Sequence, residues 1–334
     1  MTGPDHPDPT RESPPVGEGR AIADLVAFQV RLMDATGPTR RGQHAKGHGS
    51  VTAGFAVRPD LPEALRVGVF REPATFAALL RFSNGFAADD RQPDVRGLAI
   101  KLFDVPGPRL LDDDDPGHDF VLANHPAFFA PTVRRALDFF AAKVALDVAG
   151  VPPTQALARL AVDFPLEARL FPEFLGPPPS SPLLDSYWSV TPSRLGATAA
   201  KYLVRPQAPG PAAPESTPAD SPDFLRLALL DHLATRRQPA AFDFCVQTRD
   251  DPATMPLEDP TVEWSSPWVA VATLILPPQD LDGPGREAGG EPLAFNPWRC
   301  LPEHQPLGGI NRARRAVYEA SLARRRKTSS RDVP

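Results

Sequence analysis

The chain has 334 residues, of which 42% are hydrophobic, so it can bury a substantial core in one large domain or in two ordinary ones. A formal net charge of -5 argues against a generally basic nucleic-acid-binding protein. The two cysteines, Cys245 and Cys300, form neither a CxxC or zinc spacing nor a disulfide framework, which favours a reducing compartment.

Proline-rich segments divide the chain, with 43 prolines against an average usage of about 5%. We predict a disordered arm over 1–20, irregular loops over 205–223 and 277–292, and a tail over 327–334, which leaves 21–326 as the folded domain. The arm has no apolar signal segment, and no run of about 18 apolar residues occurs. We therefore expect a soluble, cytoplasmic protein without a membrane span.

The predicted elements come in separate runs of strands and helices. Helical periodicity is found in 21–37, 132–150, 153–164 and the basic segment 311–326. Strand patterns occupy 50–57, 78–85, 95–105, 119–129, 187–206, 240–251 and 268–277. This order predicts an α+β fold with a largely antiparallel sheet that can close into a barrel. No GxGxxG, Walker A or HExxH motif supports a nucleotide-binding or zinc-peptidase interpretation.

The first candidate site residues lie in the segment "RRGQHAKGHGSVTAGF" (40–55). His44 stands just before a glycine-rich turn that leads into a strand, and Arg41 lies three residues upstream. Histidine is the usual general acid–base at neutral pH. A loop histidine is nevertheless more often solvated or structural, so both interpretations stay open.

Two further segments carry polar residues inside strand patterns. Arg81 and Ser83 alternate along "RFSNG" and are predicted to point to one face of the strand. A buried arginine needs an anionic partner, and an ordinary ion pair with an aspartate of the segment 89–94 would supply one. Asn124 lies between apolar residues and a Pro-aromatic corner in "LANHPAFF", where a turn role is the alternative.

The basic segment near the end of the chain contains Tyr318, one of only three tyrosines. Arg314 precedes it by four residues and Arg325 follows it by seven, and on an α-helix these steps advance by about 400° and about 700°. The three side chains therefore share one stripe. These side chains could simply be exposed to solvent, or they could belong to a nucleic-acid-binding helix, although the negative net charge argues against the latter. The stripe could also hold a phenolate ionised by neighbouring cations and able to bind a metal.

Four blocks in this order resemble the haem catalase family: "RGQHAKGHGSVTAGF", "RFSNG…DVRGLAIKLF", "DFVLANHPAFF" and "RRAVY". The family shows Arg-x-x-His-Ala-Lys-Gly, Arg-Phe-Ser with a later Arg-Gly-x-Ala-x-Lys, Asn-x-Pro-x-Phe-Phe, and Arg-x-x-x-Tyr. The similarity covers roughly residues 25–326. It implies a central antiparallel β-barrel with surrounding helices, a C-terminal haem-binding helix, and buried haem b as the iron-containing cofactor.

The resemblance also implies a role for each matching residue. Tyr318 would be the iron ligand and Arg314 its charge partner. His44 would be the acid–base on the opposite face, with Asn124 beside it and Ser83 bonded to its ring. The residues expected to meet the haem propionates are Arg41, Arg81 and Arg325.

The implied activity is peroxide decomposition by a catalase or peroxidase of reduced size, which we expect to lack the C-terminal helical domain of full-size catalases. Its partners would be hydrogen peroxide or an organic hydroperoxide, with an organic electron donor and self-association into a homo-oligomer also considered. Because "EASLARRR" follows the tyrosine where the family has Pro-Asp-Thr-His, isomerisation or dehydration of a fatty-acid or other hydroperoxide is an alternative. A non-catalytic haem-binding role is a third, disfavoured by the presence of both His44 and Asn124.

Overall fold

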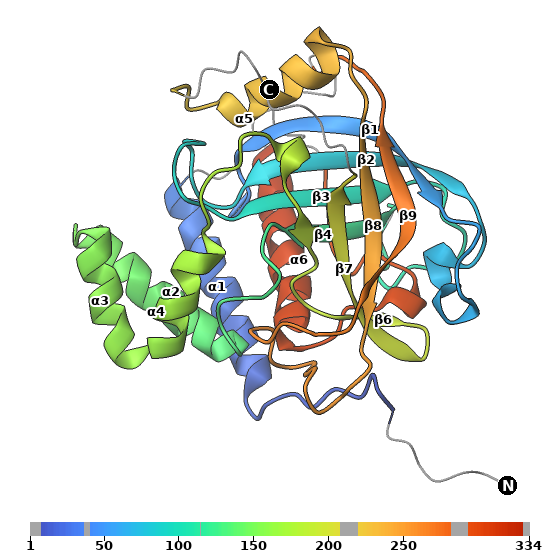
Figure 1. The fold of residues 1–334 in the computed structure, drawn as a ribbon. Helices are drawn as coiled ribbons and strands as arrows, with labels where there is room; N and C mark the ends of the chain where they lie inside the picture. The colour runs from blue at the N-terminus through green and yellow to red at the C-terminus, as the bar shows by residue number, and fades with distance from the viewer. Residues whose placement is uncertain (1–7, 37–40, 114, 208–219, 282–292, 330–334) are drawn as a thin grey trace, which may run out of the picture.

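The computed structural model describes residues 8–36, 41–113, 115–207, 220–281 and 293–329. Its centre is a closed antiparallel β-barrel (Figure 1). Neighbouring strands follow the order β5-β4-β3-β2-β1-β9-β8-β7-β6, and an additional pairing of β5 with β7 closes the ring, leaving β6 attached outside it. The prediction of an α+β fold around an antiparallel barrel is confirmed.

The strands agree with most of the predicted segments. Their bounds are β1 Gly47–Val57, β2 Thr75–Asn84, β3 Arg96–Leu102, β4 His118–Ala123, β5 Tyr187–Trp188, β6 Ser193–Leu195, β7 Thr198–Pro206, β8 Ala240–Thr248 and β9 Trp268–Leu276. The single strand predicted over 187–206 is divided into three, and the strand predicted over 119–129 ends at Ala123, because the backbone turns at Asn124 and Pro126 cannot donate to a ladder.

The barrel interior is filled with aromatic side chains. Phe55, Phe120 and Phe244 are buried at its centre, with ring centroids 5.2 Å apart for Phe55–Phe244 and 4.8 Å for Phe120–Phe244. Residues alternate between the two faces of each strand, so the residues between these core positions point outward toward the helices. The packed interior leaves the outer face of the barrel as the place for a large site.

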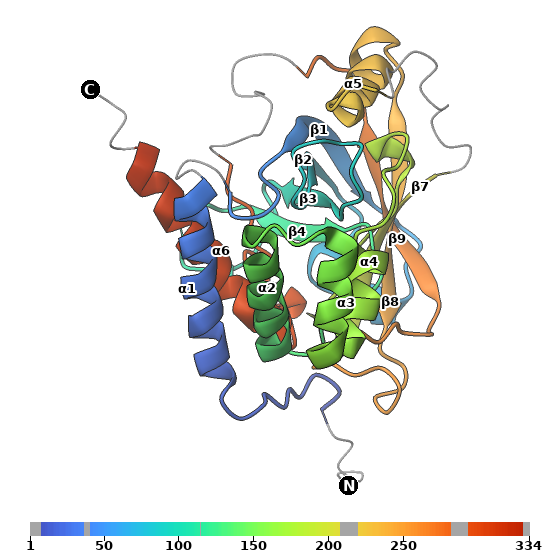
Figure 2. The same cartoon turned by 90° about the vertical axis from the view of Figure 1, so that its left-hand side faces the viewer.

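The helices lie against the outside of the barrel (Figure 2). They are α1 Glu18–Thr36, α2 Val133–Val148, α3 Pro153–Asp163, α4 Pro165–Phe174, α5 Phe224–Leu230 and α6 Gly309–Ser329. Helices α1, α2 and α6 lie side by side, and α2 to α4 share a second, phenylalanine-rich core. None of the helices in the described part of the chain has the length and apolar composition to cross a membrane.

Short helices account for two differences from the sequence prediction. Helix α4 was not predicted; it begins at Pro165, a residue whose fixed φ suits the first helical turn, directly after α3. Helix α5 follows the predicted loop 205–223 and buries Leu225 and Leu229. Within that loop and the one predicted over 277–292, residues 208–219 and 282–292 lie outside the described residues.

The prediction of a disordered arm needs correction for residues 8–20, while residues 1–7 lie outside the described residues. Thr10 is buried, and helix α1 begins at Glu18. Arg312 of α6 forms ion pairs with both Glu12 and Glu18, and these ion pairs hold the segment against the body of the protein. At the other end, α6 continues to Ser329, into the predicted tail 327–334, of which 330–334 lie outside the described residues.

Candidate active site

A cavity of about 570 Å³ lies where the outer face of strands β2 to β4 meets helices α1, α2 and α6. Its volume falls within the range of about 300–1,000 Å³ that is typical of cofactor and ligand sites. The predicted site residues that line it are Arg41, His44, Arg81, Ser83, Arg314, Tyr318 and Arg325. Asn124 does not line it, although its neighbour Ala123 does. The fold therefore brings residues from both ends of the chain around one space.

His44 is held in a strained backbone conformation, with a positive φ of 54° that non-glycine residues seldom adopt. Its backbone N–H donates to the Gly85 carbonyl at 2.8 Å, and its carbonyl accepts from Arg81 Nη2 at 2.9 Å. The ring nitrogen Nδ1 lies 3.0 Å from Ser83 Oγ. Backbone and ring contacts together fix the direction of the imidazole.

Gly97 of β3 leaves room for the His44 ring. It pairs with Ser83 of β2 in the sheet. A Cβ atom at position 97 would lie 2.5 Å from His44 Nδ1, 2.6 Å from His44 Cε1 and 2.9 Å from Ser83 Oγ. These separations are shorter than van der Waals contact, so only glycine fits without movement of the histidine. No role was predicted for this glycine, which lies within "RGLAIKLF" in the sequence.

The imidazole of His44 is neutral at ordinary pH. Burial lowers its pKa to about 3, and the positive charges of Arg81, Arg314 and Arg41 act in the same direction. A hydrogen bond to the backbone of Asn84 opposes them only in part. A neutral ring in contact with the cavity is able to accept a proton there.

Tyr318 lies on α6 and contributes to another wall of the cavity. The guanidinium carbon of Arg314 lies 5.6 Å from the centroid of the Tyr318 ring, within the distance of a cation–π interaction. Arg325 lies two helical turns further along α6 and lines the same cavity. The predicted stripe of Arg314, Tyr318 and Arg325 therefore faces one common space.

Two arginines near the β1 end of the cavity hold backbone oxygens. Arg41 Nη2 donates to the Leu293 carbonyl at 2.5 Å, and Arg81 contacts His44 as described. The alternative ion-pair partners considered for Arg81 are engaged with other cations. The pairs are Asp89 with Arg91, Asp90 with Lys46 and Asp94 with Arg96.

The side chain of Asn124 is occupied by two partners outside the cavity. Its Oδ1 accepts from the backbone N–H of Arg96 at 2.6 Å, and its Nδ2 donates to Asp185 Oδ2 at 2.9 Å. Burial raises the pKa of the Asp185 carboxyl, and the hydrogen bond from Asn124 acts in the opposite sense. Both polar ends of the amide are thus engaged in joining β3 and the turn after β4 to the segment before β5.

One side of the cavity is apolar, a feature that was not predicted from the sequence. We name it the phenylalanine wall, formed by Phe86, Phe128, Phe129, Phe140 and Phe174. Ring centroids are 5.1 Å apart for Phe129–Phe140 and 6.0 Å apart for Phe86–Phe140. Phe86 is 49% exposed, so the wall reaches the surface. The signal available in the sequence was the phenylalanine density of "DFF" and "HPAFF" in segments that proved to be adjacent.

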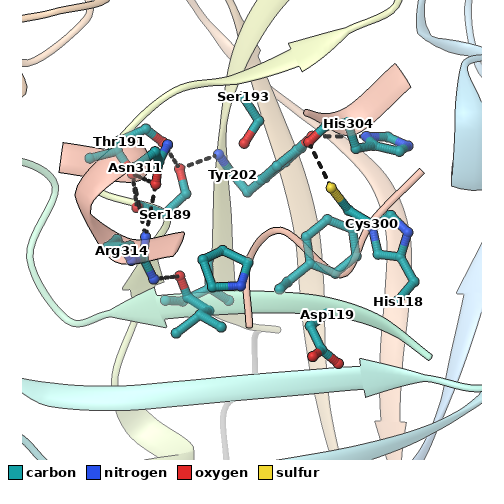
Figure 3. A pocket seen from close by; sticks show the side chains of 14 residues that line it. His118, Asp119, Ser189, Thr191, Ser193, Tyr202, Cys300, His304, Asn311 and Arg314 are labelled. Carbon is teal, nitrogen blue, oxygen red and sulfur yellow. Dashed lines mark hydrogen bonds between the residues drawn. The ribbon is translucent and has the colours of Figure 1, made fainter. Parts of the chain in front are cut away.

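A smaller cavity of about 20 Å³ is lined by Arg314 and by residues of β4 and β7 (Figure 3). It is large enough for one water molecule. Among its lining residues, His118 and His304 are buried, and Tyr202 Oη is 2.9 Å from His304 Nδ1. Arg314 lines both cavities and so connects the large site with the smaller one.

No protein-family model and no curated protein sequence matches the chain. Among solved structures, it is similar to a bacterial catalase (TM-score 0.58, 17% identity, 94% of this chain covered). It is also similar to catalase A from Saccharomyces cerevisiae (TM-score 0.61, 18% identity, 97% covered) and to a fungal catalase (TM-score 0.61, 16% identity, 97% covered). The chain has a catalase-type fold. It spans 61%, 68% and 66% of those chains, about two thirds of their length.

Proposed function

We propose that this chain is a haem-dependent oxidoreductase that decomposes peroxides, as a catalase or a peroxidase. The observation that carries the proposal is that one cavity is lined by both His44 and Tyr318, with Arg314 against the tyrosine ring. The catalase-type fold supports the same conclusion. Hydrogen peroxide or an organic hydroperoxide is the proposed substrate, and an organic electron donor is the proposed reductant of a peroxidase reaction.

The residues around the cavity fit haem b. A phenol close to a guanidinium is suited to become an anionic ligand of iron, since the positive charge favours the ionised oxygen. Arg41, Arg81 and Arg325 offer cations for the two propionate groups, which planar guanidinium groups bind well. Bound through tyrosinate, haem would supply a ferric iron able to exchange electrons with peroxide.

His44 is proposed to move the proton that peroxide cleavage requires. A neutral imidazole takes the proton from one peroxide oxygen and returns it to the other, so that water can leave. Its depressed pKa keeps it in the accepting form. Ser83 and Gly97 are proposed to keep the ring in place, through the contact with Nδ1 and through the space left for the ring.

By the resemblance to catalases, Asn124 would lie beside His44, where its amide would donate a hydrogen bond that orients peroxide, and this role stays a prediction. Its present hydrogen bonds to Arg96 and Asp185 favour a role in holding the wall behind the cavity. Orientation of substrate by Asn124 would require its amide to leave at least one of these partners.

A second function, rearrangement or dehydration of an organic hydroperoxide, is favoured by the phenylalanine wall. An apolar surface that runs from the site to the half-exposed Phe86 could hold a hydrocarbon chain. The two functions differ in products, since rearrangement releases no oxygen and oxidises no donor. A non-catalytic haem-binding role would leave hydrogen peroxide and organic hydroperoxides unchanged.

The decisive experiment uses the full chain purified with haem supplied. Tyr318→Phe should abolish haem retention or change the ferric absorption spectrum, whereas Tyr202→Phe removes a buried phenol outside the large cavity and should leave the spectrum as it is. Oxygen release from hydrogen peroxide is then measured beside oxidation of a phenolic donor and conversion of an organic hydroperoxide. An unaltered spectrum in Tyr318→Phe would refute the ligand assignment.

Three accompanying expectations are part of the proposal. They are a cytoplasmic location, self-association into a homo-oligomer, and the absence of a nucleic-acid partner. Size measurement by light scattering tests the second, and retention on immobilised DNA and RNA at physiological salt tests the third.

A further inference from the structure

Among the described residues, the hydrogen-bond acceptors around the Arg314 guanidinium are all neutral (Figure 3). Its Nη1 lies 3.2 Å from Asn311 Oδ1 and 3.5 Å from Thr191 Oγ1, and its Nη2 donates to the Val121 carbonyl at 3.3 Å. No carboxylate of the described residues forms an ion pair with it. Its positive charge is therefore not cancelled by these contacts.

Two other arginines, Arg299 and Arg312, are paired with carboxylates. Arg299 is paired with Asp119 at 2.6 Å and with Asp113 at 2.5 Å. Arg312, two residues before Arg314 on the same helix, is paired with Glu18 at 2.6 Å and with Glu258 at 2.7 Å. Arg314 therefore differs from Arg312, its neighbour on α6, because no carboxylate of the described residues compensates its positive charge.

The orientation of the Asn311 amide is fixed by its other contacts. Asn311 is 2% exposed, and its Nδ2 donates to the carbonyls of Pro192 at 2.8 Å and Leu307 at 2.9 Å. These two bonds require Oδ1 to point toward Arg314 and Thr191. The backbone carbonyl of Asn311 is also held, by Trp298 Nε1 at 2.7 Å.

The second acceptor, Thr191, is tied to the barrel. Its Oγ1 lies 2.9 Å from Asn311 Oδ1, and its backbone carbonyl accepts from Ser189 Oγ at 2.8 Å. Ser189 Oγ in turn accepts from the Tyr202 N–H of β7 at 3.0 Å. A continuous set of hydrogen bonds thus runs from a barrel strand to the guanidinium (Figure 3).

We propose that Asn311, supported by Thr191, is a positioning residue that holds Arg314 toward Tyr318 while leaving the guanidinium charge uncancelled. This inference rests on the proposed haem function. The uncancelled charge withdraws electron density from the tyrosinate and thereby raises the ferric/ferrous reduction potential of the bound haem. A carboxylate in place of either neutral acceptor would pair with Arg314, strengthen electron donation by the tyrosinate and stabilise the ferric state.

The test is the reduction potential of the haem-loaded full chain, measured by spectroelectrochemistry. Asn311→Asp keeps the side-chain shape and adds a carboxylate next to Arg314 Nη1. Thr191→Asp adds one at the other acceptor and leaves both Nδ2 hydrogen bonds of Asn311 intact, so a folding defect of the first variant does not end the test. Both variants should have a lower potential than the parent protein.

Gln29→Glu is the matched control, since it makes the same amide-to-carboxylate change in the wall of the same cavity, at a residue that is not among the hydrogen-bond partners of Arg314. Its shift should be clearly smaller than those of the two variants. A folded, haem-loaded Asn311→Asp or Thr191→Asp protein whose potential equals that of the parent or of the control overturns the inference. Failure of the proposed function is recognised separately, because haem would then not bind or its spectrum would not depend on Tyr318.

Discussion

Gly97 of β3 and His44 are so close that a Cβ atom at position 97 would lie 2.5 Å from Nδ1 of the imidazole. The ladder places Gly97 opposite Ser83, whose Oγ is 3.0 Å from the same nitrogen. The His44 ring therefore lies between Gly97 of β3, which has no side chain, and the Ser83 hydroxyl group of β2. This arrangement makes position 97 a sensitive point for the proposed chemistry.

Gly97→Ala should displace the His44 ring and slow peroxide consumption by about 10²-fold, since a misplacement of about 1 Å can cost that much. Gly54→Ala is the control, because a Cβ at this β1 glycine meets only Thr75 Cγ2 at an ordinary 3.7 Å. Initial rates of peroxide loss and thermal unfolding are measured for both. Equal rates in the two variants would show that the ring tolerates the added methyl group.

His44→Gln should retain haem and slow peroxide consumption by about 10²–10⁴-fold, because removal of the neutral imidazole removes the proposed proton acceptor. His125→Gln is the matched control: its Nδ1 is 2.7 Å from the Ala127 carbonyl and it does not line the large cavity. The ferric spectrum and stopped-flow peroxide loss are recorded for each protein. A normal rate in His44→Gln would assign the acid–base role elsewhere.

The rate of peroxide consumption should be independent of pH between about 5 and 8, as far as His44 controls it. Its pKa is lowered to about 3, so the ring stays neutral throughout this interval. An ordinary histidine, with a pKa near 6.5, would pass from almost fully neutral at about pH 8 to almost fully protonated at about pH 5. A measured rate profile with a midpoint near pH 6.5 would contradict the lowered pKa of the His44 ring.

His44 should also make folding stability depend on pH. Its pKa is about 3 in the folded state and near 6.5 in the unfolded chain, so between these values the unfolded chain binds the extra proton. The contribution to stability is present above pH 6.5 and is lost as the pH falls toward 3. Chemical denaturation followed by circular dichroism should give a shallower loss of unfolding free energy for His44→Gln than for the parent protein between pH 6.5 and 4.

Asn124→Ala should lower the free energy of unfolding by about 1–3 kcal/mol, because it leaves the Arg96 N–H and Oδ2 of the partly buried Asp185 carboxyl without their hydrogen-bond partner. Ser83→Ala should show the opposite balance, with a smaller effect on stability and a larger effect on peroxide turnover. Denaturation midpoints and initial rates are compared for the two variants. A stable but slow Asn124→Ala protein would instead support orientation of substrate by this amide.

Much of the fold is predictable because its signals are local. The alternation of β2 and β3 and the helical periods of α1, α2 and α6 depend only on neighbouring residues, and these elements lie within a few residues of the predicted bounds. Helix α4 was not predicted because its helical pattern is short and begins at Pro165, two residues after the end of α3. The segment 8–20 was misjudged because its order comes from ion pairs with Arg312, which is distant in sequence.

The sequence by itself determined that Arg314, Tyr318 and Arg325 share one helical face, since a helix fixes the relative direction of residues four and seven apart. The tertiary structure decided that this face shares a cavity with His44, from the other end of the chain. It also decided that Gly97 adjoins the ring, that phenylalanines of α2, α4 and two loops form one wall, and that Asn124 is bonded outside the cavity. Such relationships depend on the packing of distant elements, which no local period encodes.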